Sequence, residues 1–176
     1  MAPNELYRHV AELKRRDLVQ QRSRWRAVLP HALANRLAKQ ALGRIRPDHI
    51  VSSFRAHERL LRSFSRRLGY LHDCPQALEI AKRWLKDEDW LSNPAAFNGL
   101  QLTLFMNVAP LVPKMSLSAI EAVADGDAGA VFVAPSWPSR IRWISLVRSL
   151  AYDEDLFDRA ARLVLRYAAA DEGKDR

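Results

Sequence analysis

The sequence predicts an all-α protein with one short β-hairpin near its N-terminus. Apolar residues recur at helical spacing along most of the 176 residues, and one stretch, between Asp17 and Leu29, changes to an extended pattern. Prolines, glycines and acidic residues separate the helical segments. With 48% hydrophobic and 27% charged residues, the composition is that of a globular chain, long enough for one core or two small subdomains.

The first predicted element is a helix over residues 5–16. Leu6, Val10 and Leu13 stand at i, i+4 and i+7, a spacing that places them on one face of a helix. Asn4 is a suitable N-cap, because its side chain can accept a hydrogen bond from a free backbone N–H of the first turn.

A hairpin and a second helix follow. Residues 18–19 and 25–29 read as two short extended segments around a polar tip at 21–24. From Pro30 the helical spacing returns and continues to about Arg44, and proline suits a first helical position because its missing N–H is not needed there. A helix, a hairpin and a helix resemble the closing half of a winged-helix domain. The two helices that normally precede such a wing are missing, so we predict a partial winged helix.

The next apolar pattern runs from Ile50 to Leu71 after a suitable N-cap at Asp48. Either one helix of about 24 residues or two helices joined near His57 fit this pattern. Gly69, near its end, is compatible with a close crossing between helices. Pro75 then starts another amphipathic helix.

The remaining chain predicts four more helices, separated by an irregular apolar loop and followed by a polar tail. The second half also contains a weak repeat at an offset of 42 residues, in which Leu104-Phe105-x-x-Val108 matches Leu146-Val147-x-x-Leu150. The predicted helices begin near residues 95, 116, 140 and 153, with the acidic run 153–155 in the first turn of the last helix. The irregular loop is predicted at 131–138 and the tail at 171–176.

Helical hairpins that repeat every 34 to 47 residues or so are typical of helical solenoids. A more divergent copy at residues 60–85 would make a third unit. We therefore expect a partial winged-helix subdomain over residues 1–46, a short HEAT-like stack of helical hairpins over 47–170, and the polar tail.

The net charge of +8 is unevenly distributed. Residues 1–70 carry 16 Lys and Arg against 5 Asp and Glu, whereas residues 71–176 carry 12 against 15. A basic front half favours an acidic partner, which can be a nucleic acid, a nucleotide or an acidic protein face. The chain has no run of about 18 apolar residues and no signal-peptide pattern, so we expect a cytoplasmic location without membrane contact.

Catalytic and metal-binding patterns are missing from the sequence. The five histidines are scattered, and the single cysteine, Cys74, has no base at a recognisable spacing. His72, Asp73 and Cys74 are metal-ligand types, but side chains that are adjacent in sequence do not converge on one ion. The acidic runs 87–89 and 153–155 flank helix ends, where carboxylates are ordinary. We therefore expect no enzymatic activity, no cofactor and no metal.

The candidate partner-binding residues surround the predicted hairpin. They are basic or aromatic: Arg15, Arg16, Arg22, Arg24, Trp25 and Arg26. Such a wing can lie on DNA phosphates, with Trp25 stacked on a base. The simpler interpretation is a wing that is solvated or docked on another protein domain, with Trp25 packed on the preceding helix.

Three stretches, residues 24–38, 58–73 and 146–160, resemble the region after the ATPase core in bacterial STAND-class (NLR-like) NTPases. The resemblance implies a winged helix followed by helical hairpins that lead to sensor repeats. It does not extend to ATPase activity, because none of the six glycines begins the pattern GxxxxGK[ST] that cradles phosphates. It therefore implies a C-terminal fragment or a stand-alone remnant.

From these observations we expect a non-catalytic regulatory or scaffold segment of a STAND-type NTPase that mediates interdomain or protein–protein contacts. Its partner would be a protein, including an ATPase core encoded separately. The alternative is a small winged-helix regulator that binds DNA through the same hairpin.

Overall fold

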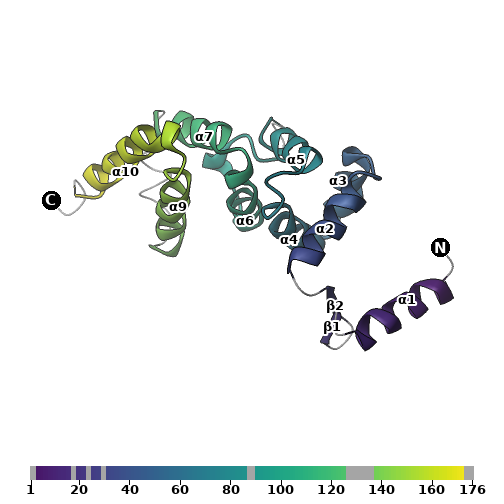
Figure 1. The fold of residues 1–176 in the computed structure, drawn as a ribbon. Coiled ribbons are helices and arrows are strands. Elements are labelled where there is room, and N and C mark those ends of the chain that lie inside the picture. Colours follow the sequence, from purple (N-terminus) through teal and green to yellow (C-terminus); the bar gives the residue numbers. More distant parts are fainter. Residues whose placement is uncertain are drawn as a thin grey trace. The chain divides into compact units, whose positions relative to one another are not determined.

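The computed structural model describes residues 3–16, 19–22, 25–28, 31–86, 90–125 and 137–172. The described chain is mainly helical, which confirms the predicted class (Figure 1). It divides into two compact units, the N-terminal unit over residues 1–46 and the helical unit over residues 47–176. Among the described residues, no helix combines the length and the apolar character that crossing a membrane requires.

The N-terminal unit consists of a helix, a two-stranded hairpin and a second helix. These elements are α1 (Pro3–Arg15), β1 (Val19–Arg22), β2 (Trp25–Val28) and α2 (His31–Leu42). The two strands pair antiparallel, with Val19 opposite Val28 and Arg22 opposite Trp25. Helix α1 begins two residues before the predicted start, because Pro3 suits the first turn. Ala34 and Leu42 are the buried apolar residues of α2.

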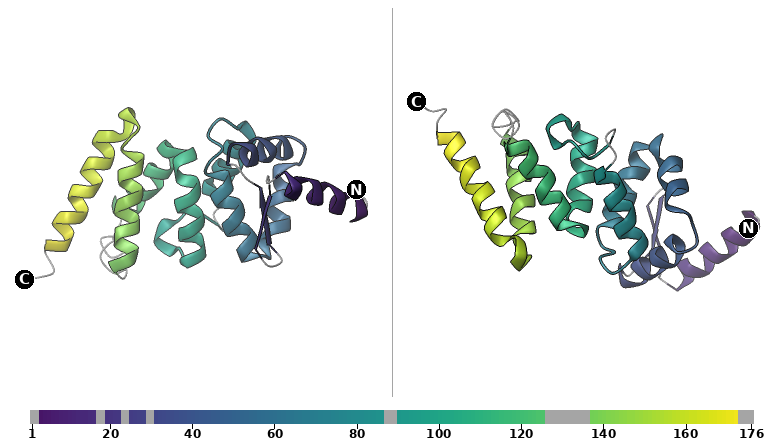
Figure 2. Two further views of the ribbon diagram at one scale, coloured as in Figure 1. Left: turned by 60° about the horizontal axis from the view of Figure 1, so that its bottom comes forward. Right: turned by 90° about the horizontal axis from the view of Figure 1, so that it is seen from above.

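The helical unit contains seven described α-helices and three short 3₁₀ turns, arranged in a row in Figure 2. The helices are α3 (Pro47–Arg55), α4 (Glu58–Leu68), α5 (Pro75–Lys86), α6 (Gly99–Val108), α7 (Pro113–Asp125), α9 (Trp137–Leu150) and α10 (Phe157–Glu172). The 3₁₀ turns are η1 (Pro94–Ala96), η2 (Ala109–Leu111) and η3 (Glu154–Leu156).

The pattern from 50 to 71 forms two helices, the second of the two predicted alternatives. The chain breaks at Ala56 and His57, and α4 starts at Glu58 without a side-chain cap from His57. Apolar periodicity continues across this break, because both helices bury the same stripe in one core, so periodicity alone did not distinguish them.

The predicted start of α6 was wrong by four residues. Residues 94–96 form the turn η1, and α6 begins at Gly99 behind a capping box. Asn98 Oδ1 accepts from the Gln101 backbone N–H at 2.9 Å, and Gln101 Oε1 accepts from the Asn98 backbone N–H at 3.0 Å. This reciprocal pair stabilises the helix start at Asn98.

Two other boundaries also differ from expectation. Helix α7 begins at Pro113, three residues before the predicted start, since proline fits its first turn. The acidic run 153–155 belongs to the turn η3, which Asp153 caps, and α10 starts only at Phe157. Of the predicted loop 131–138, residues 131–136 lie outside the described residues, while Trp137 and Pro138 belong to α9.

The core of the helical unit contains two aromatic clusters. Trp84 stacks on Trp90, with ring centroids 5.3 Å apart, and meets Phe64 edge-on at 6.1 Å. Further along the unit, Trp143 of α9 packs against Phe105 of α6 at 5.8 Å. These contacts join helices that are distant in sequence into one core.

Polar contacts between helices recur at sequence separations close to the repeat offset. Arg62 Nη1 donates to Thr103 Oγ1 at 2.9 Å across 41 residues, and Asn107 Nδ2 donates to Ser65 Oγ at 2.8 Å across 42 residues. Helix α10 is joined to α7 at similar separations, since Arg159 pairs with Glu121 across 38 residues and Arg166 with Asp125 across 41. Helices about 42 residues apart therefore lie side by side in this unit.

The end of α4 crosses α6 at close range, and Gly69 makes this possible. A Cβ at position 69 would lie 2.4 Å from the backbone oxygen of Asn107, far inside van der Waals contact. Gly69 has a φ of −56°, so any residue could adopt its backbone conformation. Glycine is required at position 69 because a side chain there would occupy the space of the Asn107 backbone.

We predict that Gly69→Ala lowers the free energy of unfolding by about 1 to 3 kcal/mol, the usual effect of overpacking a filled contact. Denaturant unfolding followed by tryptophan fluorescence measures the change. Gly99→Ala is the matched control, because a Cβ there meets nothing within 4 Å. Equal stabilities for the two variants would contradict the close-crossing role.

Candidate functional site

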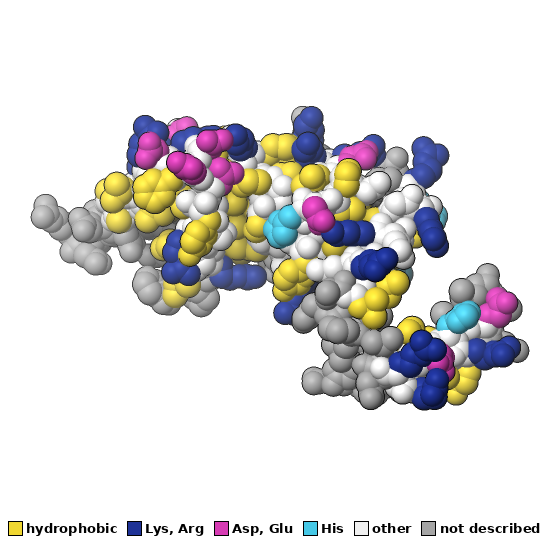
Figure 3. All heavy atoms as spheres, in the orientation of Figure 1, with side chains coloured by type: hydrophobic (Ala, Val, Ile, Leu, Met, Phe, Trp, Pro, Cys, Tyr) yellow, Lys and Arg dark blue, Asp and Glu magenta, His cyan; other side chains and the backbone are white. Residues whose placement is uncertain are grey.

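The excess positive charge lies entirely in the N-terminal unit. Residues 1–46 contain 11 Lys and Arg but only 3 Asp and Glu, a net +8, whereas residues 47–176 contain 17 of each. Figure 3 shows basic side chains gathered on α1. The charge boundary coincides with the boundary between the units, so the N-terminal unit is the candidate site for an acidic partner.

Two of the predicted site residues, Arg15 and Arg16, share one carboxylate on their own helix. Arg15 donates from Nε and Nη2 to the two oxygens of Glu12 at 2.9 and 2.8 Å, and Arg16 Nε donates at 2.6 Å. The hydrogen bonds from Arg15 and then from Arg16 lower the pKa of Glu12 to about 2. The arginine side chains remain 72% and 62% exposed. This trio therefore presents two guanidinium groups but a net charge of only +1.

The hairpin carries three other predicted residues, whose backbone positions are defined by the strand register. Arg22 is opposite Trp25, and Arg26 is opposite Gln21, in adjacent pairs of the ladder. The ladder register therefore places the backbones of these three residues. Arg24 lies outside the described residues.

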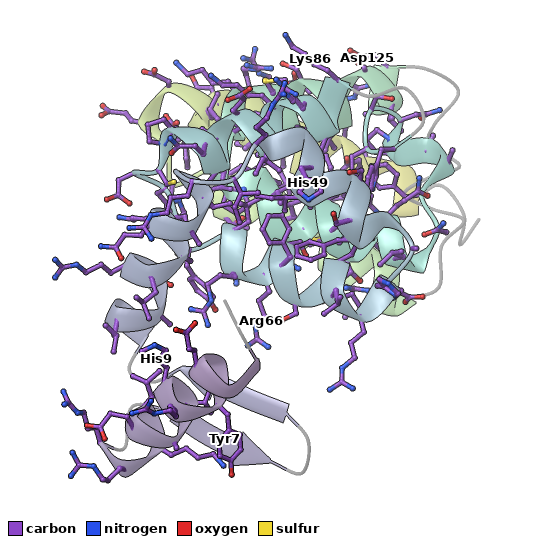
Figure 4. All side chains as sticks on the ribbon, turned by 90° about the vertical axis from the view of Figure 1, so that its right-hand side faces the viewer. Tyr7, His9, His49, Arg66, Lys86 and Asp125 are labelled. Carbon is purple, nitrogen blue, oxygen red and sulfur yellow. The ribbon has the colours of Figure 1, made fainter. Side chains whose placement is uncertain are left out.

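Some exposed residues of this unit were missed by the sequence reasoning. Tyr7 is 69% exposed on α1 (Figure 4), and Arg36 and Arg44 are exposed near the end of the unit. Arg36 and Arg44 can be recognised as part of the basic surface from the net charge of residues 1–46, once the boundary of the unit is known. The involvement of Glu12 was also missed, although its spacing to Arg15 and Arg16 is the i, i+3 and i, i+4 spacing of helical ion pairs.

The described part of the helical unit contains His72, Asp73 and Cys74, the metal-ligand types considered from the sequence. No three His, Cys, Asp or Glu side chains among the described residues are placed to hold a metal ion. Cys74 is buried, and its thiol donates to Gln76 Oε1 at 3.4 Å. The side chains of His49, Arg66 and Lys86 lie on three different helices and do not converge (Figure 4).

No protein-family model, curated protein or solved structure matches this chain.

We expect the carboxyl group of Glu12 to titrate near pH 2, well below its ordinary pKa of 4.5. Because the folded-state pKa is depressed, the ion pairs stabilise α1 above about pH 4.5, and this contribution is lost as the pH falls towards 2. NMR titration of the carboxyl carbon measures the midpoint. Replacing both Arg15 and Arg16 by Gln should return it towards 4.5, and an ordinary midpoint in the unmodified chain would contradict the pairing.

Proposed function

We propose that this chain is a non-catalytic scaffold in which the N-terminal unit docks onto an acidic protein partner and the helical unit supports that contact. One observation carries the proposal: the whole net charge of +8 belongs to a unit of 46 residues, while the larger helical unit is electrically balanced. A charge imbalance of this size in so small a unit favours association with a surface of opposite sign.

The packing of the helical unit supports the scaffold role. Helices α4 and α5, α6 and α7, and α9 and α10 are successive pairs, and polar contacts link one pair to the next at separations of about 41 residues. We interpret these pairs as a short HEAT-like stack. Proteins built in this way use their extended surfaces to hold partners.

The resemblance to STAND-class NTPases suggests which class of protein the partner belongs to. In that family a winged helix connects the ATPase core to the helical repeats. Here the N-terminal unit contains a helix, a hairpin and a helix, which we interpret as a partial winged helix. We therefore propose that the partner is an acidic surface on a separately encoded ATPase core. The contact between Arg15 and Glu12 shows the kind of interaction that we expect with the partner. The Arg15 guanidinium group binds the Glu12 carboxylate through two hydrogen bonds.

A DNA-binding regulator is the second candidate, and a specific observation favours it. The hairpin carries Arg22 and Arg26, and Tyr7 is an exposed aromatic side chain on the neighbouring helix in sequence. Arginines and exposed aromatics together are typical of nucleic-acid surfaces. This candidate requires affinity for duplex DNA that falls steeply with salt.

Titration of the full chain with fluorescent duplex DNA at two salt concentrations separates the two candidates. We predict no salt-sensitive binding, because the charges of the unit are proposed to meet a protein. Binding that weakens with salt, and that disappears in the double variant Arg22→Glu with Arg24→Glu, would instead establish DNA contact. The charge-matched control is Lys82→Glu with Arg162→Glu, two exposed residues of the helical unit.

A second experiment tests the protein partner directly. The neighbouring reading frames are searched for a product with GxxxxGK[ST], and that product is mixed with the full chain in a calorimetric titration. We predict binding that Arg22→Glu with Arg24→Glu weakens by about tenfold or more, whereas the control variant leaves it unchanged. Failure of the two proteins to bind would argue against the ATPase partner.

A further inference from the structure

The far end of the helical unit has an apolar groove between α9 and α10. Its volume is about 370 Å³, and its walls include Ile144, Val147 and Arg148 from α9 and Phe157, Val164 and Leu165 from α10. Three of the apolar side chains are well exposed, Ile144 by 42%, Phe157 by 57% and Leu165 by 68%. Figure 3 shows this region as a group of hydrophobic side chains on the surface. We call it the terminal groove.

The preceding helix pair shows what normally covers such a position. Helix α9 packs against both α6 and α7, and Trp143 of α9 lies 5.8 Å from Phe105 of α6. A helix therefore occupies the furrow that the α6–α7 pair leaves. The terminal groove is the corresponding furrow of the last described pair, so a helix has the shape that suits it.

The chemistry of the terminal groove differs from that of the preceding pair. The buried residues Leu117 and Ile120 of α7 correspond to Ala160 and Leu163 of α10, an offset of 43. At the same offset the polar residues that receive Arg159 and Arg166 are replaced by apolar ones. Ser118, Glu121 and Asp125 become Ala161, Val164 and Ala168. A helix with an arginine row like that of α10 would lose its side-chain acceptors here, so an apolar covering face fits better.

One charged side chain lines the groove, and it indicates the sign of the charge that a partner would carry there. Arg148 is the one charged side chain among the lining residues, it is exposed, and it makes no hydrogen bond or ion pair within the part of the chain that the structure describes. A carboxylate on the covering helix would pair with it. A second copy of this chain packed through the same face offers no carboxylate among its lining residues to pair with Arg148.

The groove has a volume of about 370 Å³, which gives room for a few side chains. Helix-in-groove recognition uses such a site, with three or four apolar anchors from successive turns.

We propose that the terminal groove binds one amphipathic helix of a partner protein, which inserts an apolar face between Phe157 and Leu165 and pairs an acidic side chain with Arg148. This binding site is independent of the N-terminal unit. It is therefore not affected if the acidic-partner function of that unit proves wrong.

The test uses the full chain and a fluorescent helical peptide with Leu at i, i+3, i+4 and i+7 and Glu at positions flanking this face. We expect saturable binding by fluorescence anisotropy, weakened about tenfold or more by Leu165→Glu. The control Leu60→Glu changes an exposed apolar side chain on α4, 42% exposed against 68% for Leu165, and should leave the affinity unchanged. Both substitutions are at exposed positions, so the fold is retained, and circular dichroism verifies this.

A charge swap tests whether a carboxylate of the bound helix pairs with Arg148. Arg148→Glu should weaken binding of the Glu peptide, and a peptide with Lys in place of Glu should bind this variant better than it binds the original chain. The proposal is overturned if the original chain shows no saturable binding at peptide concentrations up to about 1 mM. It is also overturned if Leu60→Glu weakens binding as much as Leu165→Glu, or if sedimentation shows a dimer that Leu165→Glu dissociates.

Discussion

The close contact between α4 and α6 is the constraint on which the helical unit depends. A helical hairpin of this kind exposes apolar surface on the side where the next hairpin packs, so its stability comes from stacking. At this first stacking interface the backbones approach so closely that position 69 has no space for a Cβ beside Asn107. The side chain of Asn107 then donates to Ser65, which is fully buried on α4. The crossing and the hydrogen bond fix the position of α6, and α6 in turn receives Trp143 of α9.

The interactions between helix pairs change along the unit. Between α4 and α6 they are hydrogen bonds in which at most one partner is charged, such as that from Asn107 to Ser65. Between α7 and α10 they are arginine–carboxylate pairs, of which Arg159 with Glu121 is the less exposed. Partly exposed ion pairs contribute little to stability but discriminate well between alternative alignments of two helices. Among the described residues, neither kind of contact lines the terminal groove between α9 and α10, which is why we infer an apolar occupant for it.

The two units have different electrostatic characters. In the helical unit the charges balance, and several of them pair between helices. In the N-terminal unit, by contrast, Glu12 is shared by two arginines and few other carboxylates exist. Such a unit is well suited to long-range attraction of an acidic surface. Because the unit is small, the shape of the partner's surface would decide the geometry of the contact.

The sequence by itself determined the elements that local rules control. Apolar periodicity predicted the helices, and the extended pattern located the hairpin residues. The repeat offset of 42 is close to the sequence separation of helices that lie side by side, such as α4 and α6. Gly69 was compatible with a close crossing, but glycine at a helix end is more often a C-cap, so the crossing itself is established only by its short distance to Asn107. The basic bias of the front half was visible from composition alone.

Other features were decided only by the tertiary structure. The break at His57 and the start of α6 at Asn98 depend on which turn packs on the core and which side chains then cap it. The charge boundary became clear only when contacts separated residues 1–46 from the rest. The terminal groove was not predictable, because Arg148 and Leu165 belong to different helices, and only the angle at which those helices pack decides whether a furrow opens between them.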